Sequence, residues 1–186
     1  MSHRPPSAFD RGELGALGTF VPLASFLRKA GEFPVYATLC ALFLAFGLVR
    51  RRWLGAALIT IVEMLVTWKV SDAFKLFFDR PRPPIWFAVH EPSASYASGH
   101  ATLSLAFYGF IAWLVWASPL APALKRAVAA LALVWIGAIG WSRLALGAHY
   151  PTDVLGGYAL GAAAVCFAIV AYHASIERFS ASKTFA

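Results

Sequence analysis

The chain has 186 residues, of which 60% are hydrophobic and 13% charged, and its mean hydropathy is +0.66. A soluble domain has about 25% charged residues, and one soluble core of this size would not bury so many large apolar side chains, so a bilayer is the expected solvent. The net charge of +7 does not indicate nucleic-acid binding, because the basic residues stand in short segments between apolar runs, which is typical of membrane topology.

Five apolar runs are long enough to cross a bilayer as helices: residues 33–49, 53–71, 101–117, 127–141 and 154–172. Each has about 15 to 20 residues, or about 22 to 30 Å of helix. A shorter run, 14–27, is interrupted by Pro22. It is either a short sixth span, which we favour, or a helix lying in the membrane interface. The sequence predicts an all-α, polytopic membrane bundle of about six helices that forms a single domain over residues 1–186.

Positively charged loops indicate how this bundle is oriented. Arg50–Arg52, Lys125 with Arg126, and Arg178 with Lys183 share one face, which the positive-inside tendency places in the cytoplasm. Segments 72–100 and 142–153 lie on the opposite face, and they are basic too. A ligand would explain those charges, so we expect an active face outside the cytoplasm.

Three segments on that face carry the polar residues that point to chemistry. They are "KLFFDRPRP" around residue 79, "ASGHA" around residue 99 and "SRLALGAHYPTD" from residue 142. A lone Lys, Arg or His at a membrane edge is usually an anchor or a hydrogen-bonded interfacial residue. A coincidence is a poor explanation for the whole set, which comprises Lys75, Arg82, Ser98, Gly99, His100, Ser142, Arg143, His149 and Asp153.

These residue types suit phosphoryl transfer. The transition state of a phosphate ester spreads negative charge over three oxygens, which Lys75, Arg82 and Arg143 can bind. The beginning of a helix at residues 98–100 also favours an anion. Two histidines then serve an in-line displacement, one attacking phosphorus and one protonating the leaving oxygen. Asp153, four residues after His149, is near enough to fix its tautomer.

A metal-dependent phosphatase would need a cluster of carboxylates. The acids expected on this face are scattered and matched by cations: Asp72, Asp79, Glu91 and Asp153. We therefore expect no metal and no other cofactor.

Together, the three segments resemble the signature of the type 2 phosphatidic acid phosphatase family, membrane lipid phosphatases related to vanadium haloperoxidases. The match covers about residues 53–165, and Ala97 stands where the family usually has proline. The resemblance implies that His149 is the nucleophile that forms a phosphohistidine, that Asp153 orients it and that His100 is the general acid. It implies a six-helix bundle, metal-independent catalysis and phosphate binding by Lys75, Arg82, Ser98, Gly99, Arg143 and Ser142.

Hydrolysis of a lipid phosphate or diphosphate at the extracytoplasmic face is the preferred function. The substrates considered are polyprenyl phosphate or diphosphate, mildly favoured, and phosphatidylglycerol phosphate, phosphatidic acid and lipid A phosphates. A phosphotransferase with the same phosphohistidine and a non-enzymatic lipid-binding or transport protein are the alternatives. The sequence indicates no oligomeric state.

Six further residues lead to narrower expectations. Glu63, inside a span, is expected to meet a polar partner on another helix. Arg80 either helps to bind a second phosphate or is a solvated or headgroup-binding residue. His90 and Glu91 lie in the connector 83–97 with no motif around them, so we expect both to be solvated. Glycines 157 and 161 are spaced for close helix packing.

Overall fold

The computed structural model describes residues 20–84 and 91–184, with side chains described as far as residue 175. The chain folds into α-helices joined by a short 3-10 turn, η1, at Arg51–Trp53. The helices are α2 (Val21–Ala30), α3 (Phe33–Val49), α4 (Leu54–Phe78), α5 (Gly99–Ala117), α6 (Pro122–Ala145) and α7 (Pro151–Thr184). The expected all-α architecture is confirmed.

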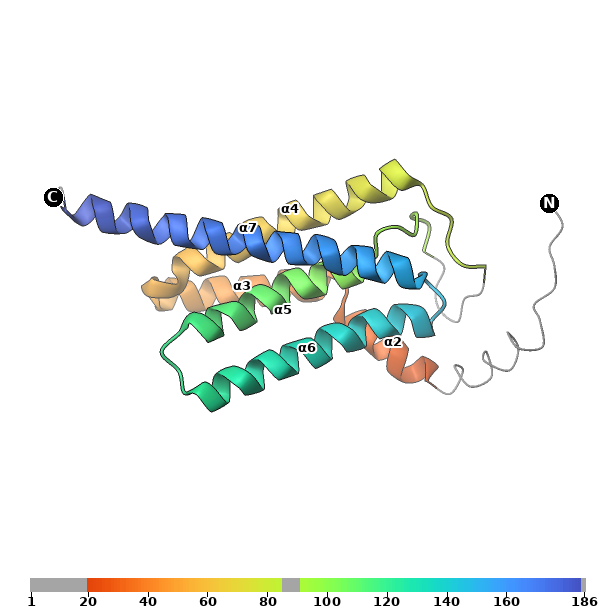
Figure 1. Cartoon of the computed structure of the whole chain (residues 1–186), viewed down its shortest axis with the longest axis horizontal. Helices are drawn as coiled ribbons and strands as arrows, with labels where there is room; N and C mark the ends of the chain where they lie inside the picture. Colours follow the sequence, from red (N-terminus) through yellow and green to blue (C-terminus); the bar gives the residue numbers. More distant parts are fainter. Residues whose placement is uncertain (1–19, 85–90, 185–186) are drawn as a thin grey trace.

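The long helices run back and forth along one axis (Figure 1). One end of the bundle carries the turn between α3 and α4, the turn between α5 and α6, and the C-terminus. The other end gathers the last turn of α4, the first turn of α5 and the connection from α6 to α7. The three polar segments therefore lie at one end, and the Arg50–Arg52 and Lys125–Arg126 segments lie at the opposite end.

Helix α5 is central, because it packs against α4, α6 and α7. Its contact with α7 is made close by glycine, as predicted: a Cβ on Gly157 would come within 2.6 Å of the carbonyl oxygen of Ser98. At Gly161 it would come within 2.7 Å of the carbonyl oxygen of Thr102. Any other residue at these positions would push the two helices apart.

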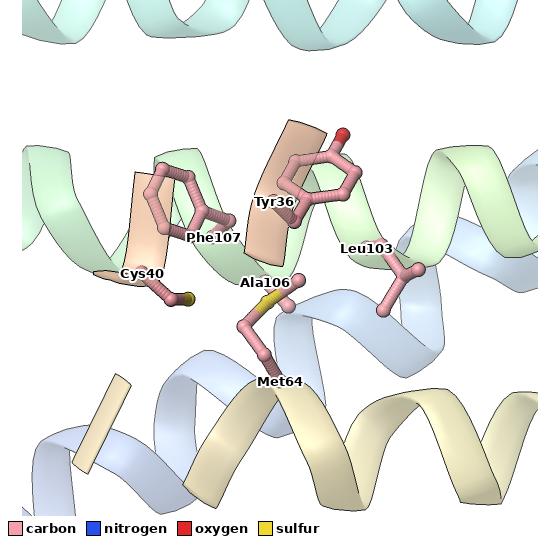
Figure 2. Packing of buried hydrophobic residues seen from close by; sticks show 6 residues of the cluster. All are labelled: Tyr36, Cys40, Met64, Leu103, Ala106 and Phe107. Atoms are coloured by element: carbon pink, nitrogen blue, oxygen red, sulfur yellow. The ribbon is translucent and has the colours of Figure 1, made fainter. Parts of the chain in front are cut away.

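One cluster of buried side chains joins α3, α4 and α5. Figure 2 shows Tyr36 and Cys40 from α3 meeting Met64 from α4 and Phe107 from α5. This core is formed from large apolar and aromatic side chains, so its burial holds the helices that carry the polar end of the bundle in fixed register.

The outer surface of the bundle is apolar. Leucine, valine and phenylalanine side chains are more than half exposed on several helices, including Phe26, Val62, Leu131, Leu155 and Phe167. Helices α4 (with η1), α5, α6 and α7 are long and apolar enough to cross a membrane, and α2 with α3 forms a fifth candidate that is bent by 45°. The exposed apolar side chains are what lipid contact requires.

Only the second half of the predicted short span 14–27 falls within the described residues, and that half belongs to α2. Helix α2 has 10 residues, or about 15 Å, which is too short to cross a bilayer. Residues 14–19 lie outside the described part of the chain.

The expectation for Glu63 is wrong. Its side chain is buried in α4, with 8% of the residue exposed, and neither carboxyl oxygen has a hydrogen-bond partner among the described residues.

Candidate active site

The first segment leaves α4 through a left-handed residue. Asp79 has φ 39°, and its N–H donates to the carbonyl of Lys75 at 3.0 Å. Asp79 thereby ends the helix, and the prolines at 81 and 83 prevent it from continuing. Lys75 lies in the last turn, close to the start of α5, because a Cβ on Gly99 would lie 3.6 Å from its Nζ.

The third segment is a tight connection between α6 and α7. Gly147 has φ 65°, a left-handed conformation that glycine adopts without strain. Pro151 then starts α7, and the carboxylate of Asp153 accepts a hydrogen bond from the N–H of Tyr150 at 2.9 Å. An acidic side chain three residues into a helix that reaches back to the N-cap N–H is half of a capping box. This local structure fixes His149 and Asp153 relative to each other.

Nε2 of His149 lies 3.1 Å from Nη1 of Arg82. Arginine is only a donor, so Nε2 carries the lone pair and Nδ1 carries the proton. The lone pair of Nε2 therefore accepts a hydrogen bond from the guanidinium of Arg82 and points to the place where a phosphate bound by that guanidinium would lie. The same Arg82 is fixed by hydrogen bonds to the carbonyls of Ala148 at 3.0 Å and Ser93 at 2.7 Å.

Ser95 joins His149 to Asp153. Its hydroxyl donates to Oδ2 of Asp153, and its oxygen lies 3.4 Å from Nδ1 of His149. The direct distance from Nδ1 of His149 to Oδ2 of Asp153 is 3.6 Å, longer than a hydrogen bond. Ser95 is fully buried, and it matches no part of the motif, so no signal in the sequence pointed to it.

Asp153 is also bound by Arg80, at 2.6 Å from Nη1 to Oδ1. Arg80 donates to Thr152 at 2.7 Å, and its guanidinium lies over the ring of Tyr150 at 4.3 Å. Arg80 thus holds the first turn of α7, and these contacts show neither of the two roles expected from the sequence.

The second segment begins α5 beside these groups. The N–H of Ser98, the N-cap residue, donates to the backbone carbonyl of Asp153 at 3.0 Å, which ties the start of α5 to the start of α7. Nε2 of His100 is buried and has no partner among the described residues. The break between α2 and α3 lies against this imidazole: a Cβ on Gly31 would come within 2.8 Å of Cδ2 of His100.

Arg82 and Arg143 are bridged by Glu91. Oε2 of Glu91 lies 2.9 Å from Nη2 of Arg82, and Oε1 accepts a short hydrogen bond from Nη2 of Arg143. The expectation that Glu91 is solvated is therefore wrong; His90 lies outside the described residues. Burial alone would raise the pKa of Glu91, but Arg143 and Arg82 outweigh burial and lower it.

Burial has the larger effect on His149. It lowers the pKa of the imidazole below the usual 6.5, and Arg82 and Arg143 lower it further, against the opposing effects of Asp153 and Glu91. The ring is therefore neutral over a wider pH range than an exposed histidine.

The structure thus brings most of the predicted site residues to one end of the bundle. Ser142 differs from the others in its contacts, because its buried hydroxyl donates to the carbonyl of Ile139 one turn earlier in α6 at 2.6 Å. Within residues 20–84 and 91–184, no three His, Cys, Asp or Glu side chains are placed to hold a metal ion together.

A family model described as the PAP2 superfamily matches residues 52–177, which contain all three segments. The chain belongs to the PAP2 superfamily. A PAP2 relative from Bacillus subtilis strain 168, phosphatidylglycerophosphatase B, is 34% identical over 70% of this chain and 63% of its own length. YbjG of Escherichia coli K12, named provisionally as an undecaprenyl-diphosphatase, is 30% identical over 76% of this chain and 68% of its own length. This chain thus spans less than two thirds of the Bacillus relative.

The PAP2 fold is also seen in a solved structure. The crystal structure of a transmembrane PAP2-type phosphatidylglycerolphosphate phosphatase from Bacillus subtilis superposes with a TM-score of 0.75. That comparison covers 93% of this chain and 90% of the other, at 26% identity.

Proposed function

We propose that this protein hydrolyses a lipid phosphate or diphosphate at the extracytoplasmic face of the membrane through a phosphohistidine. The observation that carries the proposal is the 3.1 Å contact between Nε2 of His149 and Arg82. It places the unprotonated nitrogen of a buried imidazole beside a guanidinium that donates to it here and that can bind the phosphate to be attacked.

The reaction has two steps. Nε2 of His149 attacks phosphorus, the bond from phosphorus to the lipid oxygen breaks, and His100 gives a proton to that oxygen. Water then attacks the phosphohistidine, His100 takes a proton from this water, and the bond from nitrogen to phosphorus breaks to release phosphate. Proton transfer of this kind contributes about 10²- to 10⁴-fold in rate.

Cationic side chains supply the charge stabilisation that a metal would otherwise give. Arg82 and Arg143 are buried, and buried guanidiniums interact strongly with an anion because little water screens them. Lys75 lies beside the N-terminus of α5, where unpaired N–H groups also favour an anion.

The substrate class follows from the surroundings of the site and from the relatives. The site lies at the end of a bundle whose outer surface is apolar, so a phosphate attached to a hydrocarbon in the bilayer can reach it. The names of the relatives support phosphatidylglycerol phosphate and a polyprenyl diphosphate as the first substrates to test.

The test is phosphate release from purified lipid phosphates in detergent by wild type and His149→Ala. We expect His149→Ala to lose release entirely while remaining folded, because the attacking atom is gone. His173→Ala is the matched control, since His173 lies exposed on α7 and contacts Trp113 and Tyr172, far along the helix from the site. Retention of more than a few per cent of activity by His149→Ala would overturn the assignment.

The same assay tests the absence of a metal from the reaction. We expect full activity in excess EDTA, and loss that Mg²⁺ restores would contradict the proposal. Recovery of the phosphate on a second lipid instead of in solution would favour the phosphotransferase alternative.

A further inference from the structure

Glu91 occupies the position between the two arginines that the proposed function assigns to the substrate. One of its carboxyl oxygens binds Nη2 of Arg82, and the other binds Nη2 of Arg143. The side chains of these arginines are only 6% and 1% exposed, against 23% for Glu91. The carboxylate thus lies on the solvent side of a buried cationic pair.

A carboxylate and a phosphate present the same pattern to such a pair, because both offer two oxygens to parallel guanidinium donors. Nη2 of Arg82 also donates to Oγ of Ser93 at 3.0 Å and to the carbonyl of Ala94 at 3.3 Å, so its two N–H groups leave no room for a phosphate while Glu91 is bound. Any phosphate bound by the two arginines must first displace the carboxylate and compensate for the lost ion pairs.

Arg143 has donors that Glu91 leaves unused. Its Nε and Nη1 are buried and have no acceptor among the described residues. A buried donor without a partner is costly, so a ligand with more oxygens than a carboxylate gains hydrogen bonds here. A terminal phosphate has three free oxygens and up to two charges, whereas a phosphodiester has two free oxygens and one charge.

We propose that Glu91 is an internal competitor that sets a threshold for anion binding at the Arg82–Arg143 pair. The cost of displacing Glu91 is the same for every anion. The extra charge and oxygen of a terminal phosphate compensate for the lost ion pairs of Glu91. The single charge of a phosphodiester only replaces the charge of the carboxylate, so it gives no net gain in binding free energy. Glu91 therefore keeps the abundant phosphodiester headgroups of a bilayer from occupying the site, and it returns to the arginines when phosphate leaves.

The inference rests on the proposed function for the identity of the site, but its test requires no turnover. Calorimetry measures the dissociation constants of inorganic phosphate and dioctanoyl phosphatidylglycerol for the full chain in detergent. Wild type is compared with Glu91→Gln, which keeps the shape of the side chain and removes its charge. Asp79→Asn is the matched control, because Asp79 is an exposed carboxylate at the end of α4 and asparagine tolerates its left-handed backbone.

We expect Glu91→Gln to bind both ligands about tenfold more tightly or better, since a close charge pair no longer competes. Asp79→Asn should stay within about twofold of wild type. Unchanged or weaker binding of both ligands by folded Glu91→Gln would show that Glu91 only supports the structure and would overturn the proposal. Tightening for one ligand alone would also overturn it, because a competitor affects every anion equally.

Glu91→Asp keeps the measurement decisive if Glu91→Gln does not fold. The shorter side chain retains the charge but reaches both arginines less well. We therefore expect Glu91→Asp to bind the ligands more tightly than wild type does, and less tightly than a variant whose residue 91 carries no charge. Binding by Glu91→Asp that is no tighter than wild type would count against the proposal. If tight binding appears in these variants while no lipid phosphate is hydrolysed, the threshold stands and the proposed function fails.

Discussion

Ser95 shows how much of the site depends on single hydroxyl groups. It is the group through which Asp153 reaches Nδ1 of His149 in this structure. We expect Ser95→Ala to lower kcat about 10- to 100-fold, the effect of losing a hydrogen bond to a charged group worth about 1.5 to 3 kcal/mol. Ser118→Ala is the control, because Ser118 bonds only its own helix end at the opposite side of the bundle. An activity of Ser95→Ala equal to that of Ser118→Ala would rule out this role.

The titration of His149 gives a second prediction for a single residue. In the proposed mechanism only the neutral imidazole attacks, and burial lowers its pKa below 6.5. Protonation therefore sets in at a more acidic pH than usual, and we expect the acidic limb of kcat/KM against pH to lie below 6.5. Glu91 raises the pKa of His149, so Glu91→Gln should move this limb to still lower pH. The substrate phosphate titrates at a nearby pH, so the test compares the position of the acidic limb in wild type with that in Glu91→Gln. A shift of the limb to higher pH in Glu91→Gln would contradict the prediction.

The residues that the sequence identified and those it missed differ in a physical way. His149 and Asp153 are spaced along one segment, so their local structure places them 3.6 Å apart, and the motif could indicate this pair. Ser95 and Glu91 meet their partners across 58 and 52 residues, and no local pattern indicates such contacts. Glu91 in particular stands in a connector without periodicity, where an acid is ordinarily solvated.

Helices were predictable where their apolar runs were long, but their ends were not. The predicted run 53–71 continues as α4 to Phe78, because Ser71, Asp72 and Lys75 are compatible with a helix, and it ends at the left-handed Asp79 before the prolines. Likewise α6 extends from Pro122 to Ala145, beyond the predicted 127–141. The additional turns matter, because they carry Lys75 and Arg143 to the polar end of the bundle.

The break between α2 and α3 gives a prediction for these elements. Gly31 has ordinary backbone angles, but a Cβ there would come within 2.8 Å of Cδ2 of His100 and 2.9 Å of Cγ2 of Ile139. Gly31→Ala should displace the imidazole, lowering kcat about tenfold or more and costing about 1 to 3 kcal/mol of stability. Gly137→Ala in α6 meets nothing within 4 Å and should be neutral or stabilising. Wild-type kcat in Gly31→Ala would mean that α2 and α3 do not position His100.

At the scale of the whole molecule, an apolar surface between two charged ends is typical of a membrane protein. One of these ends, called the polar end here, carries the candidate site. Composition alone was enough to predict the bilayer, because the exposed side chains of the bundle are the same apolar residues that raise the mean hydropathy. The positive charges alone do not set the direction of insertion, since both ends are basic. The inferred direction depends on assigning the cations of the polar end to phosphate rather than to topology.

Two exposed prolines at opposite ends of the bundle test that direction. Pro84 follows the segment that carries Arg82, and Pro119 lies in the turn between α5 and α6. Each is replaced by cysteine in a chain whose own cysteines, Cys40 and Cys166, are changed to alanine. With the polar end outside, a membrane-impermeant maleimide should label Pro84→Cys on intact cells and leave Pro119→Cys unlabelled until the cells are permeabilised. The reverse pattern would place Arg82 and Arg143 in the cytoplasm, and the basic residues of the polar end would then follow the positive-inside tendency with no need of a ligand.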